Sequence, residues 1–175
     1  MDNGIYDGSC LLWRSHLSGS AFTGPDMAGT VSDWIIEYLE NQGVDHIFTV
    51  SGGGSIWLND ALQRAKRMKY VCTHHEQAAG YAAEAYARVR NSAGFCLVTS
   101  GPGGTNAVSG VGSAWLDGIP VIYISGQAFL RHTINGKEGL RQLGVQEINI
   151  VDIVNPITKY ARMLGPMTDL KGETH

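Results

Sequence analysis

The 175-residue sequence lacks the features that mark membrane, nucleic-acid-binding and disulfide-stabilised proteins. No apolar run approaches the roughly 20 residues that a membrane-spanning helix needs. The net charge is −3, and no basic cluster points to nucleic acid as a partner. The three cysteines, Cys10, Cys72 and Cys96, have neither a zinc spacing nor a disulfide framework. Because Cys72 and Cys96 lie in apolar runs, we expect buried free thiols in a cytoplasmic protein.

Glycine is the residue in excess. The chain has 23 glycines, about 13% of its residues against a usual ~7%. Many of them gather in two short segments, Ser51–Ser55 (SGGGS) and Ser100–Gly104 (SGPGG). Hydrophobic residues make up 43% and charged residues 17%, which is typical of a globular domain with a core of its own.

From Thr30 onward, short apolar segments alternate with segments of helical period. In residues 30–43 apolar side chains recur at i, i+3, i+4, i+7 and i+8, which indicates a helix that Thr30 or Ser32 can cap and Gly43 can end. This alternation predicts an α/β fold: an open parallel sheet with helices on both faces. The other predicted helices are 55–66, 77–90 and 104–116, and the predicted strands are 46–50, 70–73, 94–100 and 120–125.

The later part of the chain is less regular. Residues 128–146 are polar and have no strong period, so we expect a long loop, and loops of that length are often functional. Residues 147–164 predict a short helix and then a strand at 157–161. The whole chain is predicted to divide into a disordered extension, natural or added in cloning, at 1–29, one domain at 30–164 and a tail at 165–175.

Polar residues follow all four predicted strands, at the edge where an open parallel sheet binds its ligands. The glycine corners there are either sites of close backbone approach to a ligand or tight turns with positive φ. Neither is a P-loop, and neither has the Gly-x-Gly-x-x-Gly pattern of dinucleotide-binding folds. The four polar segments are Ser51–Ser55, His74–Glu76, Ser100–Asn106 and Gly126–Gln127.

Glu76 stands where an apolar segment passes into an Ala-rich helix. It is either an acidic residue stabilised by the helix dipole or, in these apolar surroundings, a carboxyl group that holds or shares a proton. We interpret His74 and His75 as hydrogen-bonding groups, one of which lines the site. No metal site is predicted within this chain.

Four segments of the chain together resemble one known family. They are GVDHIFTVSGGGS, HHEQAAGYAAEAYAR, LVTSGPGGTNAVSGVGSAWLDGIPVIYISGQ and RQLGVQEINIV. They resemble the pyrimidine-binding domain of thiamine diphosphate enzymes, in particular the acetolactate synthase-like proteins. The resemblance runs from about residue 30 to residue 163. Its most specific part is His-Glu-Gln-Ala-Ala followed, in this order, by Thr-Ser-Gly-Pro-Gly-Gly-Thr-Asn.

The resemblance implies that Glu76 is catalytic. In the family, the glutamate at this position hydrogen-bonds N1′ of the cofactor's aminopyrimidine, and the 4′-nitrogen then removes the C2 proton of the thiazolium. The resulting carbanion attacks a 2-keto acid, carbon dioxide leaves, and the remaining unit is added to a second carbonyl. The carboxyl group must be shielded from water to share a proton with a weakly basic ring nitrogen.

The same resemblance assigns the other site residues. Gln146 would be the second catalytic residue, near the reacting carbon. The family often has proline at Ser51 and phenylalanine at Val145, and the second difference leaves the substrate pocket undefined. The residues implied to bind thiamine diphosphate are Ser51, Gly52, Gly53, Glu76, Thr99, Pro102 and Asn106.

The resemblance also implies that this chain carries half of an active site. The family holds Mg²⁺ and the diphosphate on a second domain with a Gly-Asp-Gly motif, which the sequence lacks. A middle domain binds FAD in some members. We therefore expect a fragment or one subunit of a split enzyme, inactive alone. Its partners would be a 2-keto acid and either copies of itself, in a homodimer or tetramer, or a complementary diphosphate-binding subunit.

Two alternatives to the enzyme remain open at this point. One is a non-catalytic domain of the same fold that dimerises and regulates. The small residues Ala79, Gly80 and Ala83 suit close helix packing across a dimer interface, and packing within the domain explains them nearly as well. The other is a nucleotide-binding module, which the missing Walker residues and ribose-binding acid disfavour.

Overall fold

Four short parallel strands form the centre of the protein. The computed structural model describes residues 29–134, 137 and 139–165. Within them the sheet has the order β2-β1-β3-β4, and Phe48 of β1 pairs with Val71 of β2 and Cys96 of β3. The prediction of an open parallel sheet is confirmed. The strands are β1 (His46–Thr49), β2 (Lys69–Cys72), β3 (Gly94–Val98) and β4 (Val121–Ser125).

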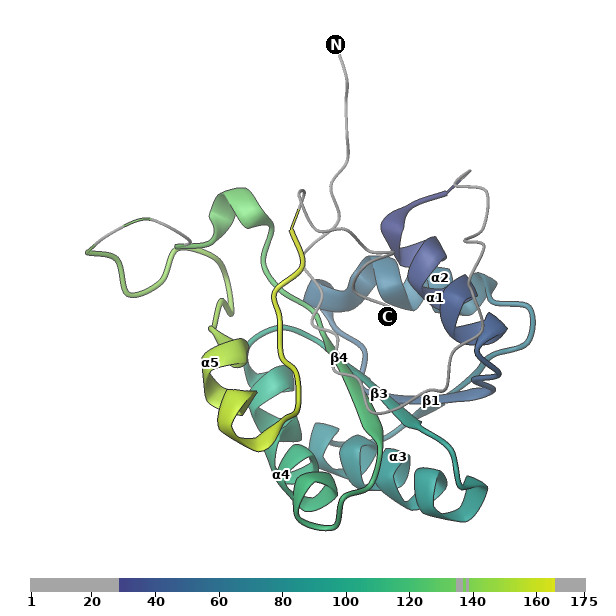
Figure 1. Cartoon of the computed structure of the whole chain (residues 1–175). Helices are drawn as coiled ribbons and strands as arrows, with labels where there is room; N and C mark the ends of the chain where they lie inside the picture. The colour runs from purple at the N-terminus through teal and green to yellow at the C-terminus, as the bar shows by residue number, and fades with distance from the viewer. Residues whose placement is uncertain (1–28, 135–136, 138, 166–175) are drawn as a thin grey trace.

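Helices cover both faces of the sheet, as predicted (Figure 1). One layer is α1 and α2, and the other is α3 and α4, with the short α5 packed against α4. None of the helices in the described ranges is long and apolar enough to span a bilayer. The helices are α1 (Val31–Asn41), α2 (Ile56–Arg64), α3 (Glu76–Arg90), α4 (Pro102–Leu116) and α5 (Ile150–Val154), and the 3₁₀ turns are η1 (Gly53–Ser55), η2 (Leu130–His132) and η3 (Asn155–Ile157).

Alternating side chains of the central strands supply both halves of the core. In β3, Phe95 and Leu97 pack with α1 and α2, whereas Cys96 and Val98 pack with α3 and α4. Since successive side chains of a strand point to opposite faces, a strand buried on both faces must be apolar throughout. This requirement explains the continuous apolar runs in the sequence.

Local signals set the helix ends. Thr30 and Asp33 form a reciprocal capping box at the start of α1, and Gly43 follows its end with a φ of +82°. His75 caps α3, because its Nδ1 accepts a hydrogen bond from the Gln77 N–H at 3.1 Å. His75 is thus occupied by the backbone of its own helix.

Small residues let α3 and α4 pack closely within the domain. A Cβ placed on Gly110 would lie 3.0 Å from Cα of Gly80 and 2.9 Å from the hydroxyl oxygen of Tyr123. Ala79 and Ala83 are fully buried in the same layer. Of the two interpretations of these small residues, the structure therefore shows packing inside the domain.

Two expectations are wrong. No strand forms at 157–161; Pro156 instead lies in the 3₁₀ turn η3, where its fixed φ suits a helical first turn. Cys72 is exposed, not buried, because β2 is an edge strand whose four residues are all exposed. Cys96 is buried as predicted. Cys10 and, apart from Gly29 and Gly165, the predicted extension and tail lie outside the described residues.

Candidate functional site

The turn after β1 lies directly against the end of β3. The Gly54 N–H donates to Oγ1 of Thr99 at 3.0 Å. A Cβ placed on Gly52 would lie only 2.5 Å from Cβ of Thr99. Gly52 has an extended φ of −172°, so close approach, and not a left-handed turn, requires glycine at this position.

The turns after β3 and β4 pack against the turn after β1, and we call the surface that the three turns form the glycine wall (residues 51–54, 99–101 and 126). A Cβ on Gly126 would lie 2.2 Å from the carbonyl oxygen of Gly54, and the Ser125 hydroxyl donates to the Thr99 carbonyl at 3.3 Å. Gly101 has a φ of +60° and is the one glycine of this wall that needs a left-handed backbone. Segments far apart in the sequence thus meet at the carboxyl ends of β1, β3 and β4.

Glu76 is the first residue of α3 and is half-buried beside this wall. Its Oε2 accepts a hydrogen bond from Nδ2 of Asn106 at 3.0 Å. Among the described residues, no donor reaches Oε1, which lies 3.7 Å from the position that a Cβ on Gly103 would take. Burial, and then the nearby Glu76 carboxylate, raise the pKa of the Cys96 thiol. One carboxylate oxygen is therefore fixed by the protein, and the other has no protein donor there.

Gln146 lies in the long loop after β4, and its backbone contacts the glycine wall at Gly101. It is exposed and has a φ of +56°. A Cβ on Gly101 would lie 2.5 Å from the Gln146 carbonyl oxygen. The backbone of Gln146 therefore packs against the turn after β3 at Gly101, the residue before Pro102.

The structure does not join every predicted site residue to Glu76. Ser51, Gly53 and Pro102 are exposed, and no hydrogen bond links them to that carboxylate. His74 is exposed as well, and no hydrogen bond joins either histidine ring to Glu76. Asn106 is hydrogen-bonded to Glu76, and a Cβ on Gly103 would lie between the Thr99 side chain, at 2.7 Å, and Oε1 of Glu76, at 3.7 Å.

Two residues near the site, Gln127 and Glu147, hold the long loop through hydrogen bonds that the sequence did not predict. Buried Gln127 donates from Nε2 to the Ile148 carbonyl at 2.8 Å. Glu147 accepts hydrogen bonds from three backbone N–H groups. Gln127 stood out only as a polar residue after a strand, and nothing in the local period marks Glu147.

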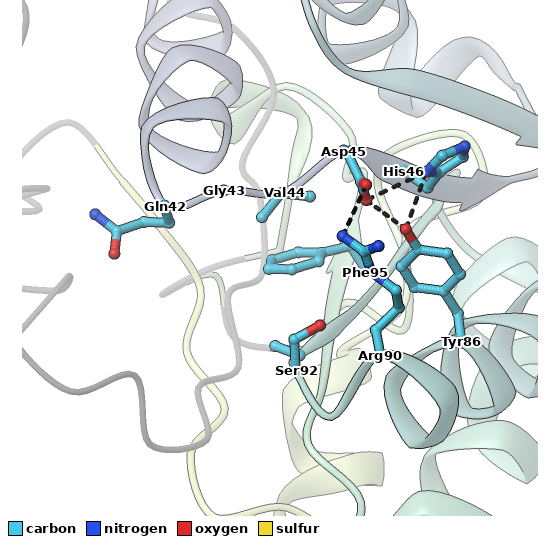
Figure 2. Close-up of a pocket in the computed structure, with 10 residues that line it drawn as sticks. Gln42, Gly43, Val44, Asp45, His46, Tyr86, Arg90, Ser92 and Phe95 are labelled. Atoms are coloured by element: carbon cyan, nitrogen blue, oxygen red, sulfur yellow. Dashed lines mark hydrogen bonds and ion pairs between the residues drawn. The ribbon is translucent and has the colours of Figure 1, made fainter.

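A second polar cluster lines a hollow at the opposite, amino-terminal end of the strands (Figure 2). The Tyr86 hydroxyl donates to Asp45, and Nδ1 of His46 lies 3.1 Å from that hydroxyl. Arg90 lies 3.2 Å from Oδ2 of Asp45. The Tyr86 hydrogen bond, opposed by burial and aided by His46 and Arg90, lowers the pKa of Asp45. These groups satisfy one another, which fits a structural role.

Comparison with known proteins identifies the fold. Residues 29–153 match the family described as Thiamine pyrophosphate enzyme, N-terminal TPP binding domain. The chain belongs to this thiamine pyrophosphate enzyme family. The match spans all four strands together with Glu76, Thr99, Asn106 and Gln146. The resemblance noted in the sequence is confirmed.

Curated relatives of this TPP-binding domain are acetolactate synthases. The chain is 38% identical over 146 residues to chloroplastic acetolactate synthase of Arabidopsis thaliana, covering 83% of this chain and 21% of that protein. It is 36% identical over 139 residues to the acetolactate synthase large subunit of Buchnera aphidicola subsp. Schizaphis graminum (79% and 23%). It is 37% identical over 139 residues to acetolactate synthase of Arthrospira platensis (78% and 23%). The chain spans about a fifth of the length of these relatives.

Proposed function

We propose that this chain is the pyrimidine-binding half of a thiamine diphosphate-dependent enzyme acting on 2-keto acids. The reaction would be decarboxylation of a donor followed by joining of the remaining unit to a second carbonyl, as the names of its acetolactate synthase relatives suggest. The observation that carries the proposal is the Glu76–Asn106 pair, in which the carboxylate is held at Oε2 and unsatisfied by the described residues at Oε1.

The donors and acceptors at this rim fit the aminopyrimidine of the cofactor. Glu76 would accept from, or share a proton with, N1′ of the ring through Oε1, because Asn106 occupies Oε2. The absence of a side chain at Gly103 leaves Oε1 accessible. When bound, thiamine diphosphate supplies the nucleophilic carbon and the electron sink that decarboxylation of a 2-keto acid needs.

The glycine wall would shape the pocket around the ring. Gly52, packed against Thr99, and Gly53, open at its Cβ position, would present their backbone to a flat ligand, and Ser51 precedes them at the exposed edge. Thr99 holds the turn after β1 through its hydrogen bond to Gly54. Thr99 and Pro102 would line the ring pocket with Asn106, and Gln146 would stand near the reacting carbon. Once the ring is bound, exclusion of water from Glu76 would strengthen the proton sharing.

The remaining half of the site would come from another domain. Among the residues that the structure describes, no three His, Cys, Asp or Glu side chains gather to bind a metal ion. We propose that Mg²⁺ and the diphosphate bind on a separate domain, of another copy or of a complementary subunit. Residues 30–164 would be the pyrimidine-binding domain. In those family members that bind FAD, the flavin belongs to a further, middle domain.

Reconstitution separates the enzyme from its non-catalytic alternative. The chain is mixed with a diphosphate-binding domain of an acetolactate synthase, thiamine diphosphate, Mg²⁺ and pyruvate, and release of carbon dioxide is measured. The proposal predicts turnover that Glu76→Gln abolishes and that Glu37→Gln, an exposed carboxylate on α1, leaves unchanged. A stable complex without turnover supports the regulatory domain.

A further inference from the structure

One carboxylate ties together the two sides of the long loop. Oε1 of Glu147 accepts a hydrogen bond from the Ile134 N–H at 2.6 Å. Its Oε2 accepts from the N–H groups of Leu143 and Gly144 at 3.0 and 2.9 Å. The segment that leaves β4 and the segment that returns to α5 are thus joined through a single side chain. A carboxylate with three N–H donors is a strong, directional clamp.

Close packing holds the same turn. A Cβ on Gly144 would lie 2.6 Å from Cβ of Ala128 and 2.7 Å from the His132 carbonyl oxygen. Nε2 of Gln142 also donates to the Gly144 carbonyl at 2.8 Å. The backbone just before Gln146 therefore has little room to shift.

The backbone after Gln146 is anchored independently. Nε2 of Gln127 donates to the Ile148 carbonyl at 2.8 Å, and its Oε1 accepts from the Ala128 N–H at 2.9 Å. Gln127 is itself only 5% exposed, so this anchor belongs to the end of β4 and to the core. Gln146 lies between two fixed points.

Gln146 needs such support because its own backbone is in a disfavoured region. A φ of +56° is uncommon for a residue with a Cβ. Its carbonyl oxygen and Cβ also lie 2.5 and 2.8 Å from the place that a Cβ on Gly101 would occupy. The surroundings must hold this conformation against the turn after β3.

We propose that Glu147 is the positioning residue for Gln146. The carboxylate fixes the preceding turn, so that Gln146 keeps its left-handed backbone against Gly101, in the turn after β3. Glu147 acts only through Gln146. The part of this inference that concerns catalysis rests on the proposed function, whereas the fixing of the backbone does not.

The test compares Glu147 with a second carboxylate that accepts backbone N–H hydrogen bonds, in this case through one oxygen only. Oε1 of Glu40 accepts from the N–H groups of Arg67 and Met68 at 2.6 and 2.8 Å, far along the chain from the loop. Glu147→Gln and Glu40→Gln are each made in the 175-residue chain. A glutamine can accept through one oxygen only, and its NH₂ group would oppose the remaining N–H donors.

The first measurement needs no cofactor. In Glu147→Gln, hydrogen-exchange protection of the Ile134, Leu143 and Gly144 amides should fall by about tenfold or more. The Cα and Cβ chemical shifts of Gln146 should also leave their left-handed values. Glu40→Gln should leave both unchanged. Gln146 shifts that are the same in Glu147→Gln and wild type would overturn the inference.

The second measurement uses the reconstituted enzyme. Gln146→Ala should lower kcat by a large factor in the wild type and by a much smaller factor in the Glu147→Gln background, because its side chain is then already misplaced. Fully additive effects would overturn the catalytic part of the inference. Absence of wild-type turnover would count against the proposed function, and the chemical shifts would still decide the role of Glu147.

Discussion

Asn106 lies 30 positions after Glu76, and its side-chain amide donates to Oε2 of Glu76 at 3.0 Å. This bond joins the first residue of α3 to α4. The position of the carboxylate therefore depends on how these two helices pack, and that packing in turn depends on Gly80 and Gly110. Site geometry and core packing are coupled in this domain.

Replacing Asn106 by alanine should weaken binding of thiamine diphosphate. A hydrogen bond to a charged group contributes about 1.5 kcal/mol or more, so the dissociation constant should rise about tenfold. Calorimetric titration measures it. The control is Asn41→Ala, which removes an amide contact to Arg67 at the end of α1. Equal affinities of Asn106→Ala and wild type would show that the bond does not position Glu76 for the cofactor.

Gly52 and Gly53 should differ sharply in their tolerance of alanine. The Cβ of Gly52→Ala would meet Cβ of Thr99 at 2.5 Å, so we expect a loss of about 1–3 kcal/mol in the free energy of unfolding. No atom lies within 4 Å of a Cβ at Gly53, so Gly53→Ala should change stability by less than about 0.5 kcal/mol. Urea denaturation of both variants provides the comparison, and similar losses would contradict the described wall.

Gly110 and Gly112 form a second matched pair, on α4. Gly110→Ala would press against Gly80 and Tyr123 and should destabilise the domain by about 1–3 kcal/mol. Gly112 has open space at its Cβ, so Gly112→Ala should stabilise the helix by up to about 1 kcal/mol. Opposite shifts of the urea midpoint are expected. Shifts in the same direction would argue against close packing of α3 and α4.

Removal of the hydroxyl group should have opposite effects on stability at Tyr123 and at Tyr86. The buried Tyr123 hydroxyl has no hydrogen-bond partner among the described residues, so Tyr123→Phe should be neutral or stabilising by about 1 kcal/mol. The Tyr86 hydroxyl donates to Asp45, so Tyr86→Phe should destabilise by a similar amount at neutral pH. Thermal unfolding distinguishes the two.

The effect of Tyr86→Phe should depend on pH. The pKa of Asp45 is lowered in the folded protein, first by Tyr86, against burial, and then by His46 and Arg90. Its stabilisation is therefore present above the unfolded-state pKa of about 3.9 and is lost as the pH falls through the lower folded-state value. The stability difference between wild type and Tyr86→Phe should shrink below about pH 4. A difference that stays constant down to pH 2 would rule out this account of Asp45.

Much of the fold followed from the sequence because hydrophobic period and capping residues are local. The helix that Thr30 caps and the apolar strand at Gly94–Val98 are examples, and each element in the first four β-α pairs lies within two residues of its predicted bounds. Burial of β2 was mispredicted because its edge position depends on strand order, which no local pattern encodes. The strand expected at 157–161 is absent because the chain continues from α5 into the 3₁₀ turn that contains Pro156.

The candidate site was predictable only in part. Placement of the polar turns at one end of the sheet follows from parallel topology, and the structure joins two of their residues, Glu76 and Asn106, by a hydrogen bond. The roles of the predicted site residues stay predictions. The roles of Gln127 and Glu147 depend on where a long loop returns. That is a tertiary property, so a sequence window could not show it.

Calorimetric titration of thiamine diphosphate with Mg²⁺ into the chain tests the central claim most directly. Wild type is compared with Glu76→Gln, and Glu37→Gln controls for the loss of one negative charge. The account predicts weak binding, since the proposed diphosphate site is on another domain. Glu76→Gln should reduce the affinity by at least about tenfold, and Glu37→Gln should not. Binding that is equally tight in wild type and Glu76→Gln would contradict the placement of the pyrimidine ring on Glu76.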